Sequence, residues 1–156
     1  MSIALREVEM QDLPVFFRCQ QDPQANYMAA FTAEDPNDWE AFSSHWRRIL
    51  ADPENVNKTI IQGQSVVGHI ASFEMEGERE VSYWVDRAFW NRGIATAALK
   101  ELLLLVTTRP LYARAAKDNL GSRRVLEKCG FVVTGEGSGY AHGRKAETEE
   151  YLFTLR

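Results

Sequence analysis

The sequence predicts one α+β domain, spanning residues 1–156, whose sheet is mixed but mostly antiparallel. Two β-branched runs, 58–62 and 65–73, are separated by a glycine-containing turn, which predicts an antiparallel hairpin. A buried strand at 80–85, an apolar helix at 93–108 and a further strand at 111–116 then follow one another. Because a strand, a crossover helix and a second strand give parallel neighbours, we expect one parallel pair in this sheet.

The first fifty residues predict a strand and two helices with an irregular segment between the helices. Alternation of apolar and polar residues at 3–8 indicates a half-buried strand. Asp12 is placed to cap a short helix that continues to Cys19, and Asp35, followed by a proline, is placed to cap the next helix. Residues 25–34 show no periodic pattern, so we expect an irregular loop there.

The C-terminal part predicts a helix and two more strands. Asn119 is positioned as the N-cap of the helix, and Gly130 ends it as a residue able to adopt the left-handed conformation. The strands are expected at 131–134 and 149–155. The glycine-rich residues 135–145 between them are expected to form a long mobile connection.

The composition argues against a polyanionic partner. The net charge is −4 and the pI is about 5.4, whereas a protein that binds nucleic acid or an anionic membrane needs a basic face. Residues 1–7 lack the apolar run of a signal peptide, and no stretch is apolar enough to predict a membrane helix. Cys19 and Cys129 form no metal-ligand pattern, so we expect free thiols, no metal and a cytoplasmic location.

The loop before the helix at 93–108 has the composition of an anion-binding site. Gly93 has no side chain, and Ala95 and Thr96 are small, so a bulky anion can approach the backbone. The first N–H groups of a helix lack internal partners and carry partial positive charge. An ordinary strand-to-helix turn has the same composition. The loop contains neither Gly-x-Gly-x-x-Gly nor the Lys-Ser/Thr pair of a Walker loop, which argues against a nucleotide-binding regulator.

Two segments resemble a known family. Residues 90–96, Trp-Asn-Arg-Gly-Ile-Ala-Thr, resemble the pyrophosphate-binding loop of the GNAT superfamily of N-acetyltransferases, in the branch that includes ribosomal-protein alanine N-acetyltransferases. Residues 115–131 resemble that branch's Asn-x-x-Ser-x-x-Val-x-Glu-Lys-x-Gly-Phe. The sequence departs from the branch at Asn91, where Gly is usual, and at Ala97, where Glu is usual. The resemblance extends from about residue 57 to the end.

This resemblance implies a fold, a co-substrate and a set of residues that bind it. The fold is a mixed, mostly antiparallel sheet of about six to seven strands, with a central splayed parallel pair and helices on both faces. The co-substrate is acetyl-CoA, whose pantetheine arm would add to the splayed edge like a strand. The implied binding residues are Trp84 and Val85 through their backbones, Arg92, Gly93, Ile94, Ala95 and Thr96 through their amides, Arg92 and Arg123 through their charges, and Asn119 and Ser122 beside the arm.

Acetyl transfer requires an unprotonated amine, stabilisation of the carbonyl oxygen and a proton for the departing thiolate. By resemblance, Ser122 is the proton donor and Asn119 supports it, although both side chains would equally suit the start of a helix. A backbone N–H near Val85 would stabilise the oxygen. Glu80 is the candidate base, and a solvated charge is its alternative role. Glu74, His69 and His142 compete with it for the role of base. The acceptor wall implied by the fold contains Tyr27, Met28 and Phe31, of which Phe31 also fits the core.

The sequence therefore predicts transfer of an acetyl group from acetyl-CoA to a primary amine, by direct attack in a ternary complex. The acceptor could be a small molecule or the N-terminus of a peptide or protein. The alternative is a non-catalytic acyl-CoA-binding sensor or scaffold, which would have no use for a thiol proton donor at Ser122. Expected partners are acetyl-CoA and an amine acceptor, without nucleic acid or membrane, and the chain could be a monomer or a homodimer.

Overall fold

The structure, a computed structural model, describes residues 2–156 and contains seven strands, five α-helices and two 3-10 turns within that range. Their order along the chain is β1 (Ala4–Glu7), η1 (Met10–Asp12), α1 (Leu13–Gln21), α2 (Pro23–Ala29), α3 (Trp39–Ala51), β2 (Val56–Gln62), β3 (Ser65–Met75), β4 (Glu78–Val85), η2 (Arg87–Phe89), α4 (Ile94–Leu105), β5 (Leu111–Ala116), α5 (Leu120–Lys128), β6 (Val132–Ala141) and β7 (Ala146–Leu155).

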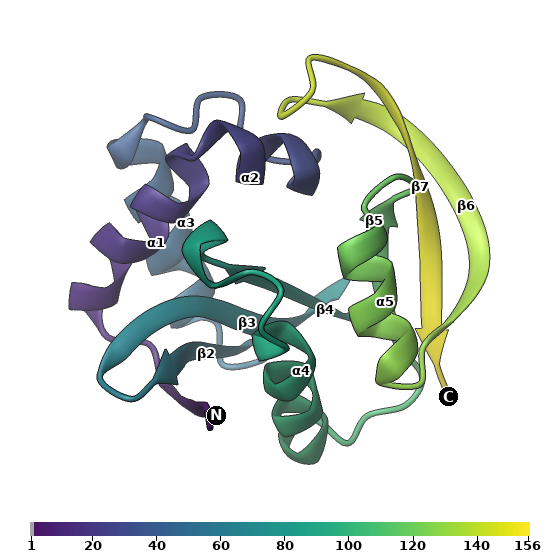
Figure 1. Cartoon of the computed structure of the whole chain (residues 1–156), viewed down its shortest axis with the longest axis horizontal. Helices are drawn as coiled ribbons and strands as arrows, with labels where there is room; N and C mark the ends of the chain where they lie inside the picture. Colours follow the sequence, from purple (N-terminus) through teal and green to yellow (C-terminus); the bar gives the residue numbers. More distant parts are fainter. Residues whose placement is uncertain (1) are drawn as a thin grey trace.

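All strands belong to one sheet in the order β1-β2-β3-β4-β5-β7-β6 (Figure 1). Every neighbouring pair is antiparallel except β4 and β5, which confirms the predicted mixed sheet with one parallel pair. These two strands are paired in register only at Glu80 and Tyr112. Because β4 continues to Val85 and β5 to Ala116 without further pairing, the sheet is open between the carboxyl ends of the two strands.

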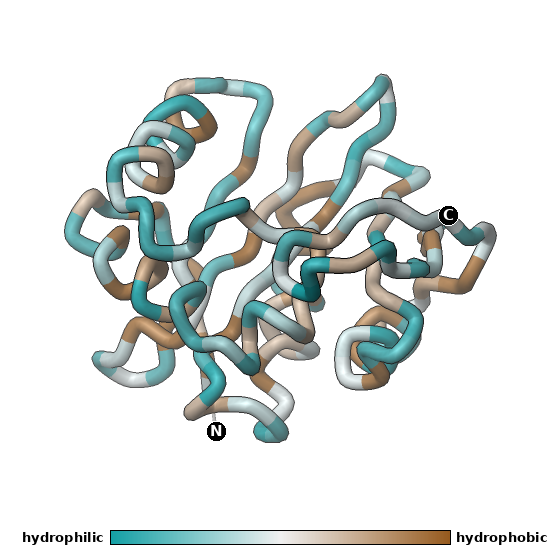
Figure 2. The backbone as a smooth tube through the Cα atoms, turned by 90° about the horizontal axis from the view of Figure 1, so that it is seen from above, coloured by the Kyte–Doolittle hydropathy of each residue, from teal (hydrophilic) through white to brown (hydrophobic). Residues whose placement is uncertain are grey.

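Apolar side chains fill both sides of the sheet. The larger cluster contains Ile94, Leu99 and Leu102 of α4 and Leu126 of α5, packed on buried strand residues. A second cluster joins Leu13 and Phe16 of α1 to Trp46 of α3. Figure 2 shows apolar stretches of the chain in the middle of the molecule and also on the coils at its two sides. The predicted arrangement, with helices on both faces, is therefore confirmed.

Gly68 lies where the backbones of β3 and β4 come close together. A Cβ atom built there would lie 2.1 Å from the carbonyl oxygen of Trp84, so no other residue fits without moving a strand. The ladder between β2 and β3 is also irregular opposite this point, between Ile60 and Ile61. Both a bulge and a close backbone approach, which a glycine inside a strand predicts, are found here.

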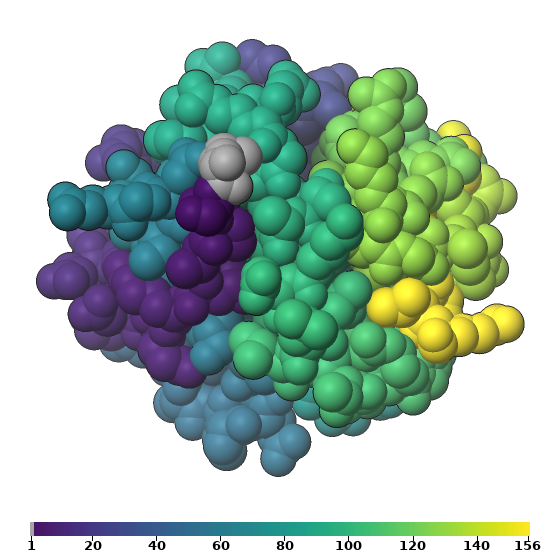
Figure 3. Space-filling model, turned by 60° about the horizontal axis from the view of Figure 1, so that its bottom comes forward, coloured from purple at the N-terminus to yellow at the C-terminus, as the bar shows by residue number. Residues whose placement is uncertain are grey.

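Helix α4 is less deeply buried than its apolar sequence predicts. It ends at Leu105 rather than near residue 108, and the Leu104 and Leu105 side chains are 75% and 57% exposed. Figure 3 shows the region of α4 at the surface, between residues from the two ends of the chain. An apolar helix face therefore lies in solvent, because the sheet covers only the side that carries Ala98, Leu99 and Leu102.

The segment 25–34, expected to be irregular, is helical over most of its first half. Asp22 caps α2 by accepting from the Gln24 amide at 3.0 Å, and the proline that follows Asp22 suits the first helical position. The short length of α2 hides the periodicity that identifies longer helices. The start of α3 also differs from the prediction, because Asp38 caps it and Asp35 caps only the preceding turn, through the Asn37 amide.

Asp12 has a different role from the helix cap predicted for it. Its carboxylate is 2% exposed and accepts two hydrogen bonds from Arg6, at 2.7 and 2.9 Å, and one from Thr59 at 2.7 Å. Burial opposes ionisation, but these bonds outweigh it and hold the pKa of Asp12 below its usual value. The residue therefore ties β1 to β2 instead of capping α1.

The predicted mobile connection at 135–145 is mostly strand. β6 runs to Ala141 and pairs with β7 along its length, apart from one irregularity between Val133 and Gly135. Gly143, in the turn, donates its N–H to the Ala30 carbonyl at 2.9 Å, and a Cβ there would lie 2.4 Å from the Asn26 carbonyl. The tip of the hairpin is thus fixed against α2 (Figure 1).

No helix within residues 2–156 has the length and apolarity needed to cross a membrane.

Candidate active site

The opening between β4 and β5 is lined by backbone groups of β4. The Asp86 amide donates to the Val67 carbonyl at 2.8 Å, and the Trp84 carbonyl also points to β3, at Gly68. Because successive residues of a strand direct their N–H and C=O groups to opposite sides, those of Tyr83 and Val85 face β5. The Val85 carbonyl accepts from the Trp90 indole at 2.8 Å. Of the two predicted pantetheine positions, Val85 rather than Trp84 therefore borders the opening.

The glycine loop leads directly from β4 into α4. Asn91 and Gly93 have left-handed φ values of 63° and 76°, and Gly93 is the N-cap of the helix. The first intrahelical bond is donated by Ala97 to the Gly93 carbonyl at 3.0 Å. Because the helical bonds begin only at Ala97, the predicted amides of the first turn have no acceptor within the helix. These amides belong to Ile94, Ala95 and Thr96.

The two predicted arginines differ in their surroundings. Arg92 is exposed, lies 5.2 Å from the centre of the Phe89 ring, and has no acidic side chain within 4 Å in the described part of the chain. Arg123 lies 3.4 Å from the Glu127 carboxylate and 5.0 Å from the centre of the Tyr151 ring. Arg92 is therefore free to meet an anion at the loop, whereas Arg123 already has two partners.

Asn119 connects α5 to α2. Its side-chain oxygen accepts from the Ser122 amide at 3.2 Å, which confirms the predicted N-cap. Its side-chain nitrogen donates to the Met28 carbonyl at 3.2 Å. The amide of Asn119 thus fixes the start of α5 against the helix that carries two residues of the predicted acceptor wall.

Ser122 has a partner that the sequence did not reveal. Its Oγ lies 2.7 Å from the hydroxyl oxygen of Tyr83, and either group can donate; the Tyr83 hydroxyl also lies 3.2 Å from the Ser122 carbonyl. Tyr83 comes from β4 and Ser122 from α5, so the bond connects the strand at the opening with the helix beside it. Burial raises the pKa of Tyr83 above its usual value, so its hydroxyl stays protonated at neutral pH.

Glu80 is buried at the closed end of the opening. Only 5% of it is exposed, and its Oε2 lies 3.4 Å from Nε of Arg114 on β5. The same guanidinium lies 3.8 Å from the carboxylate of Glu150 on β7, which is 8% exposed. Burial raises the pKa of both carboxyls, and Arg114 opposes that shift. The alternative role of Glu80 as a solvated charge does not agree with this burial.

The competing bases lie in less suitable places. His69 packs between Phe16 and Trp46, with ring centres 4.7 and 5.0 Å away, and burial lowers its pKa to about 4. Glu74 is exposed near the end of β3. His142 is exposed in the hairpin turn, and its ring meets that of Tyr140 edge to face.

The predicted acceptor residues lie on or just after α2, not in an irregular loop. Tyr27 and Phe31 are 49% and 41% exposed, so Phe31 is not a core residue, and Met28 is partly buried. Arg144 of the hairpin donates to the Tyr27 carbonyl at 2.8 Å and stacks over its ring at 4.4 Å. A concavity of about 350 Å³ lies here, lined by Tyr27, Lys117, Asp118, Arg144, Ala146, Glu147, Thr148 and Glu149.

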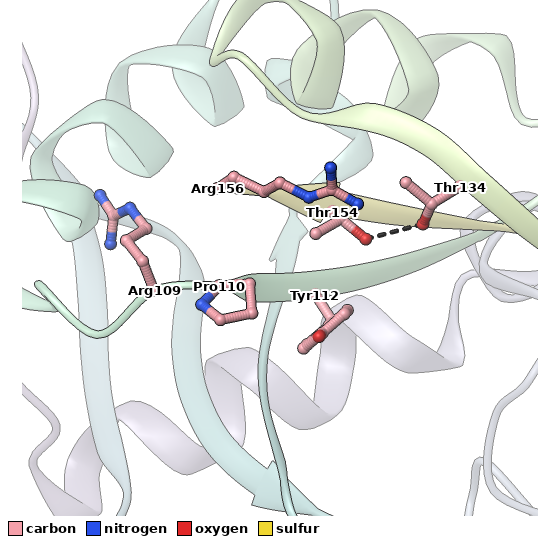
Figure 4. A pocket seen from close by; sticks show the side chains of 6 residues that line it. All are labelled: Arg109, Pro110, Tyr112, Thr134, Thr154 and Arg156. Atoms are coloured by element: carbon pink, nitrogen blue, oxygen red, sulfur yellow. Dashed lines mark hydrogen bonds between the residues drawn. The ribbon is translucent and has the colours of Figure 1, made fainter.

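A larger concavity, of about 560 Å³, lies at the start of β5, at the opposite end of that strand from the opening. Figure 4 shows Arg156 extending over Thr154 and Thr134, whose hydroxyls are 2.6 Å apart, while Arg109 points away. The Arg109 guanidinium is engaged by the Val106 and Thr108 carbonyls. This concavity is remote from the glycine loop and contains no predicted site residue.

A sheet opened between two parallel strands, with a helix N-terminus at the opening, is a fold that other solved structures share. The solved structure of Mycobacterium smegmatis RimJ in complex with CoA-disulfide has this fold, with a TM-score of 0.78 and 22% identity; the match covers 98% of this chain and 81% of RimJ.

Residues 2–132 match the acetyltransferase (GNAT) domain, and the chain belongs to this family. Bacillus subtilis (strain 168) "Putative ribosomal N-acetyltransferase YdaF" is 28% identical over 139 residues, which cover 81% of this chain and 76% of YdaF. L-amino acid N-acetyltransferase AaaT of Escherichia coli (strain K12) is 25% identical over 150 residues, covering 89% of this chain and 88% of AaaT. The predicted family is thereby confirmed.

Proposed function

We propose that this protein transfers an acetyl group from acetyl-CoA to a primary amine, by direct attack within a ternary complex. The observation that carries the proposal is the opening between β4 and β5, which is paired only at Glu80 and Tyr112. The backbones of Tyr83 and Val85 on β4 border it, and the free amides at the start of α4 adjoin its wide end. A strand-like arm ending in a pyrophosphate matches this combination.

The residues at the opening fit acetyl-CoA. The backbones of Tyr83 and Val85 would hold the pantetheine arm, the first-turn amides of α4 would hold the pyrophosphate, and the unpaired Arg92 would add charge. A Cβ atom at Gly93 would meet nothing within 4 Å, so the loop surface at this residue is open and an anion can approach it. When bound, the co-substrate supplies a thioester that an amine can attack.

The protein's own groups would manage the protons. The Ser122 hydroxyl lies 2.7 Å from the protonated hydroxyl of Tyr83, which would orient it, and this contact supports Ser122 as the group that would give a proton to a departing thiolate. The buried Glu80 has a raised pKa, which suits a base that receives a proton from an ammonium group through water. The Val85 amide would stabilise a carbonyl oxygen that gains negative charge.

The acceptor would enter on the face covered by α2 and the β6–β7 hairpin. The names of the two relatives suggest two acceptor classes, L-amino acids and ribosomal proteins. Both carry an α-amine, so a panel of amino acids, short peptides and simple amines distinguishes them. The free Cys19 and Cys129, together with use of acetyl-CoA, support a cytoplasmic location.

The test is calorimetric titration with acetyl-CoA, followed by thiol release with the amine panel. Micromolar binding and amine-dependent release are expected. Gly93→Val should weaken binding by at least about tenfold, because a branched side chain would obstruct the amides and a φ of 76° disfavours it. Binding without release by any amine would support the sensor alternative, and absence of binding would refute the proposal.

A further inference from the structure

Glu150 is a buried carboxylate without a hydrogen-bond donor among the described residues. It lies in the middle of β7, where its cross-strand neighbours are Ala116 on β5 and Gly137 on β6. Neither neighbour carries a polar side chain. The nearest cation, Arg114, stays 3.8 Å away, beyond hydrogen-bond distance. The Glu150 side chain is 11% exposed and its oxygens are not fully buried, so a cationic group entering from solvent can reach a carboxylate to which no described residue donates.

The surrounding charges leave one negative charge in excess. Glu80 and Glu150 share the single guanidinium of Arg114, at 3.4 and 3.8 Å. Glu80 is the closer of the two, so Arg114 balances it first and leaves Glu150 incompletely neutralised. The Arg114 side chain is 41% exposed, which weakens its effect further.

Space is available on the side of Glu150 away from Arg114. Gly137 has no side chain, and a Cβ atom there would lie 3.6 Å from Oε2 of Glu150. Any larger side chain at this position would therefore cover the carboxylate. The φ of Gly137 is not in the left-handed region, so no backbone requirement explains the glycine.

Glu150 lies on the face and at the level where an acceptor would react. Its partner Ala116 packs with Ala30, which follows α2, so this is the face of the proposed acceptor wall. Ala116 lies beyond Tyr112 toward the open end of β5, by about 13 Å at the usual rise per residue. Glu150 is thus level with Trp84. An arm that takes the place of a strand between β4 and β5 would lie two strand spacings from β7, on the order of 10 Å.

We propose that Glu150 binds a second, non-reacting cationic group of the acceptor, so that the preferred substrates are amines with another positive charge about 10 Å from the reacting nitrogen. The inference rests on the proposed acetyl transfer. The reacting amine must be neutral when it attacks, so it cannot itself balance the excess negative charge. A second ammonium group entering beside Gly137 can do so.

The test compares a long α,ω-diamine with the amino alcohol of the same chain length. In the unchanged protein the diamine should have the higher kcat/KM, by about tenfold or more, because only it brings a charge to Glu150. Glu150→Gln should abolish this preference and leave the amino alcohol largely unaffected. Gly137→Val should act in the same way by covering a carboxylate that remains charged. Glu136→Gln is the control, since Glu136 pairs with Tyr151 on the opposite face of β6 and is 61% exposed.

Calorimetric titration of the protein with the diamine, without acetyl-CoA, tests the subsite separately from the chemistry. Binding that Glu150→Gln weakens, in a protein that acetylates neither compound, would support the subsite and refute the proposed transfer to simple amines. Equal kcat/KM for the diamine and the amino alcohol, or a preference that survives both variants, would refute the subsite while leaving the transferase function intact.

Discussion

Removal of one hydroxyl tests whether Tyr83 acts through Ser122. Tyr83→Phe keeps the buried ring and deletes only the group that lies 2.7 Å from Ser122 Oγ. A hydrogen bond of this kind contributes about 1 kcal/mol net, so kcat should fall about fivefold. KM for acetyl-CoA should hardly change, because the backbone of Tyr83, rather than its hydroxyl, borders the opening.

A double-mutant cycle with Ser122→Ala isolates the coupling. Once the serine hydroxyl is gone, Tyr83→Phe should cost nothing further, so the double variant should be as slow as Ser122→Ala alone. Initial rates of thiol release at saturating acetyl-CoA supply the four values. Tyr112→Phe is a matched control, because within residues 2–156 its hydroxyl makes no hydrogen bond.

Two results would refute this reasoning. Equal losses from Tyr83→Phe in the presence and absence of the Ser122 hydroxyl would show that the two groups act independently. Unchanged kcat in Tyr83→Phe, with the expected loss in Ser122→Ala, would show that the serine needs no partner to be oriented.

Three further changes probe the chemistry, the sheet and the buried histidine. Ser122→Ala should reduce kcat more than Glu80→Gln, and normal turnover in both variants would contradict the proposed proton transfers. Gly68→Ala should lower the free energy of unfolding by about 2 kcal/mol or more, measured in urea, because its Cβ would lie 2.1 Å from the Trp84 carbonyl. His69 has a pKa lowered to about 4, so the folded protein disfavours its charged form. Its contribution is complete above the unfolded pKa of about 6.5 and is lost as pH falls toward 4. His69→Phe should remove about 2 kcal/mol of the stability loss between pH 7 and pH 5, and an unchanged loss would contradict the assigned pKa.

The features that follow from local sequence patterns could be predicted well. The β2–β3 hairpin, the parallel pair around α4, the Asn119 cap and the left-handed Gly130 each depend on a few neighbouring residues. Helix α2 escaped prediction because seven residues are too few to show a period. The strand after Gly130 was predicted too short because its alternating glycines resemble a loop. Cross-strand pairing with β7, which a local pattern does not reveal, holds them extended.

The site residues also fall into those that a local sequence pattern predicts and those that only the folded structure reveals. The glycine loop and the segment around Ser122 are contiguous motifs, so the sequence alone pointed to them. Tyr83, Arg114 and Glu150 become recognisable only in the folded chain, where α5 brings Ser122 to Tyr83 and the sheet brings Arg114 near Glu80 and Glu150. Tyr83 gave a weak signal as a polar-tipped ring within a buried strand, because such a hydroxyl requires a partner. Glu150 gave no signal in the sequence, because it is one of several glutamates in the same strand and nothing distinguishes it from the others.

The attachment of the hairpin tip to α2 has a consequence for how acceptor range could change. The family match ends at residue 132, and the hairpin that carries Gly137, Arg144 and Glu150 lies after it. Arg144 and Gly143 moor this hairpin to α2 through main-chain carbonyls, whose positions do not depend on the side chains of α2. Side chains on the facing surfaces of α2 and the β6–β7 hairpin can therefore be substituted while the two elements keep their relative positions. The hairpin that follows the family match is therefore held to α2 by one main-chain and one side-chain donor, both bound to main-chain carbonyls.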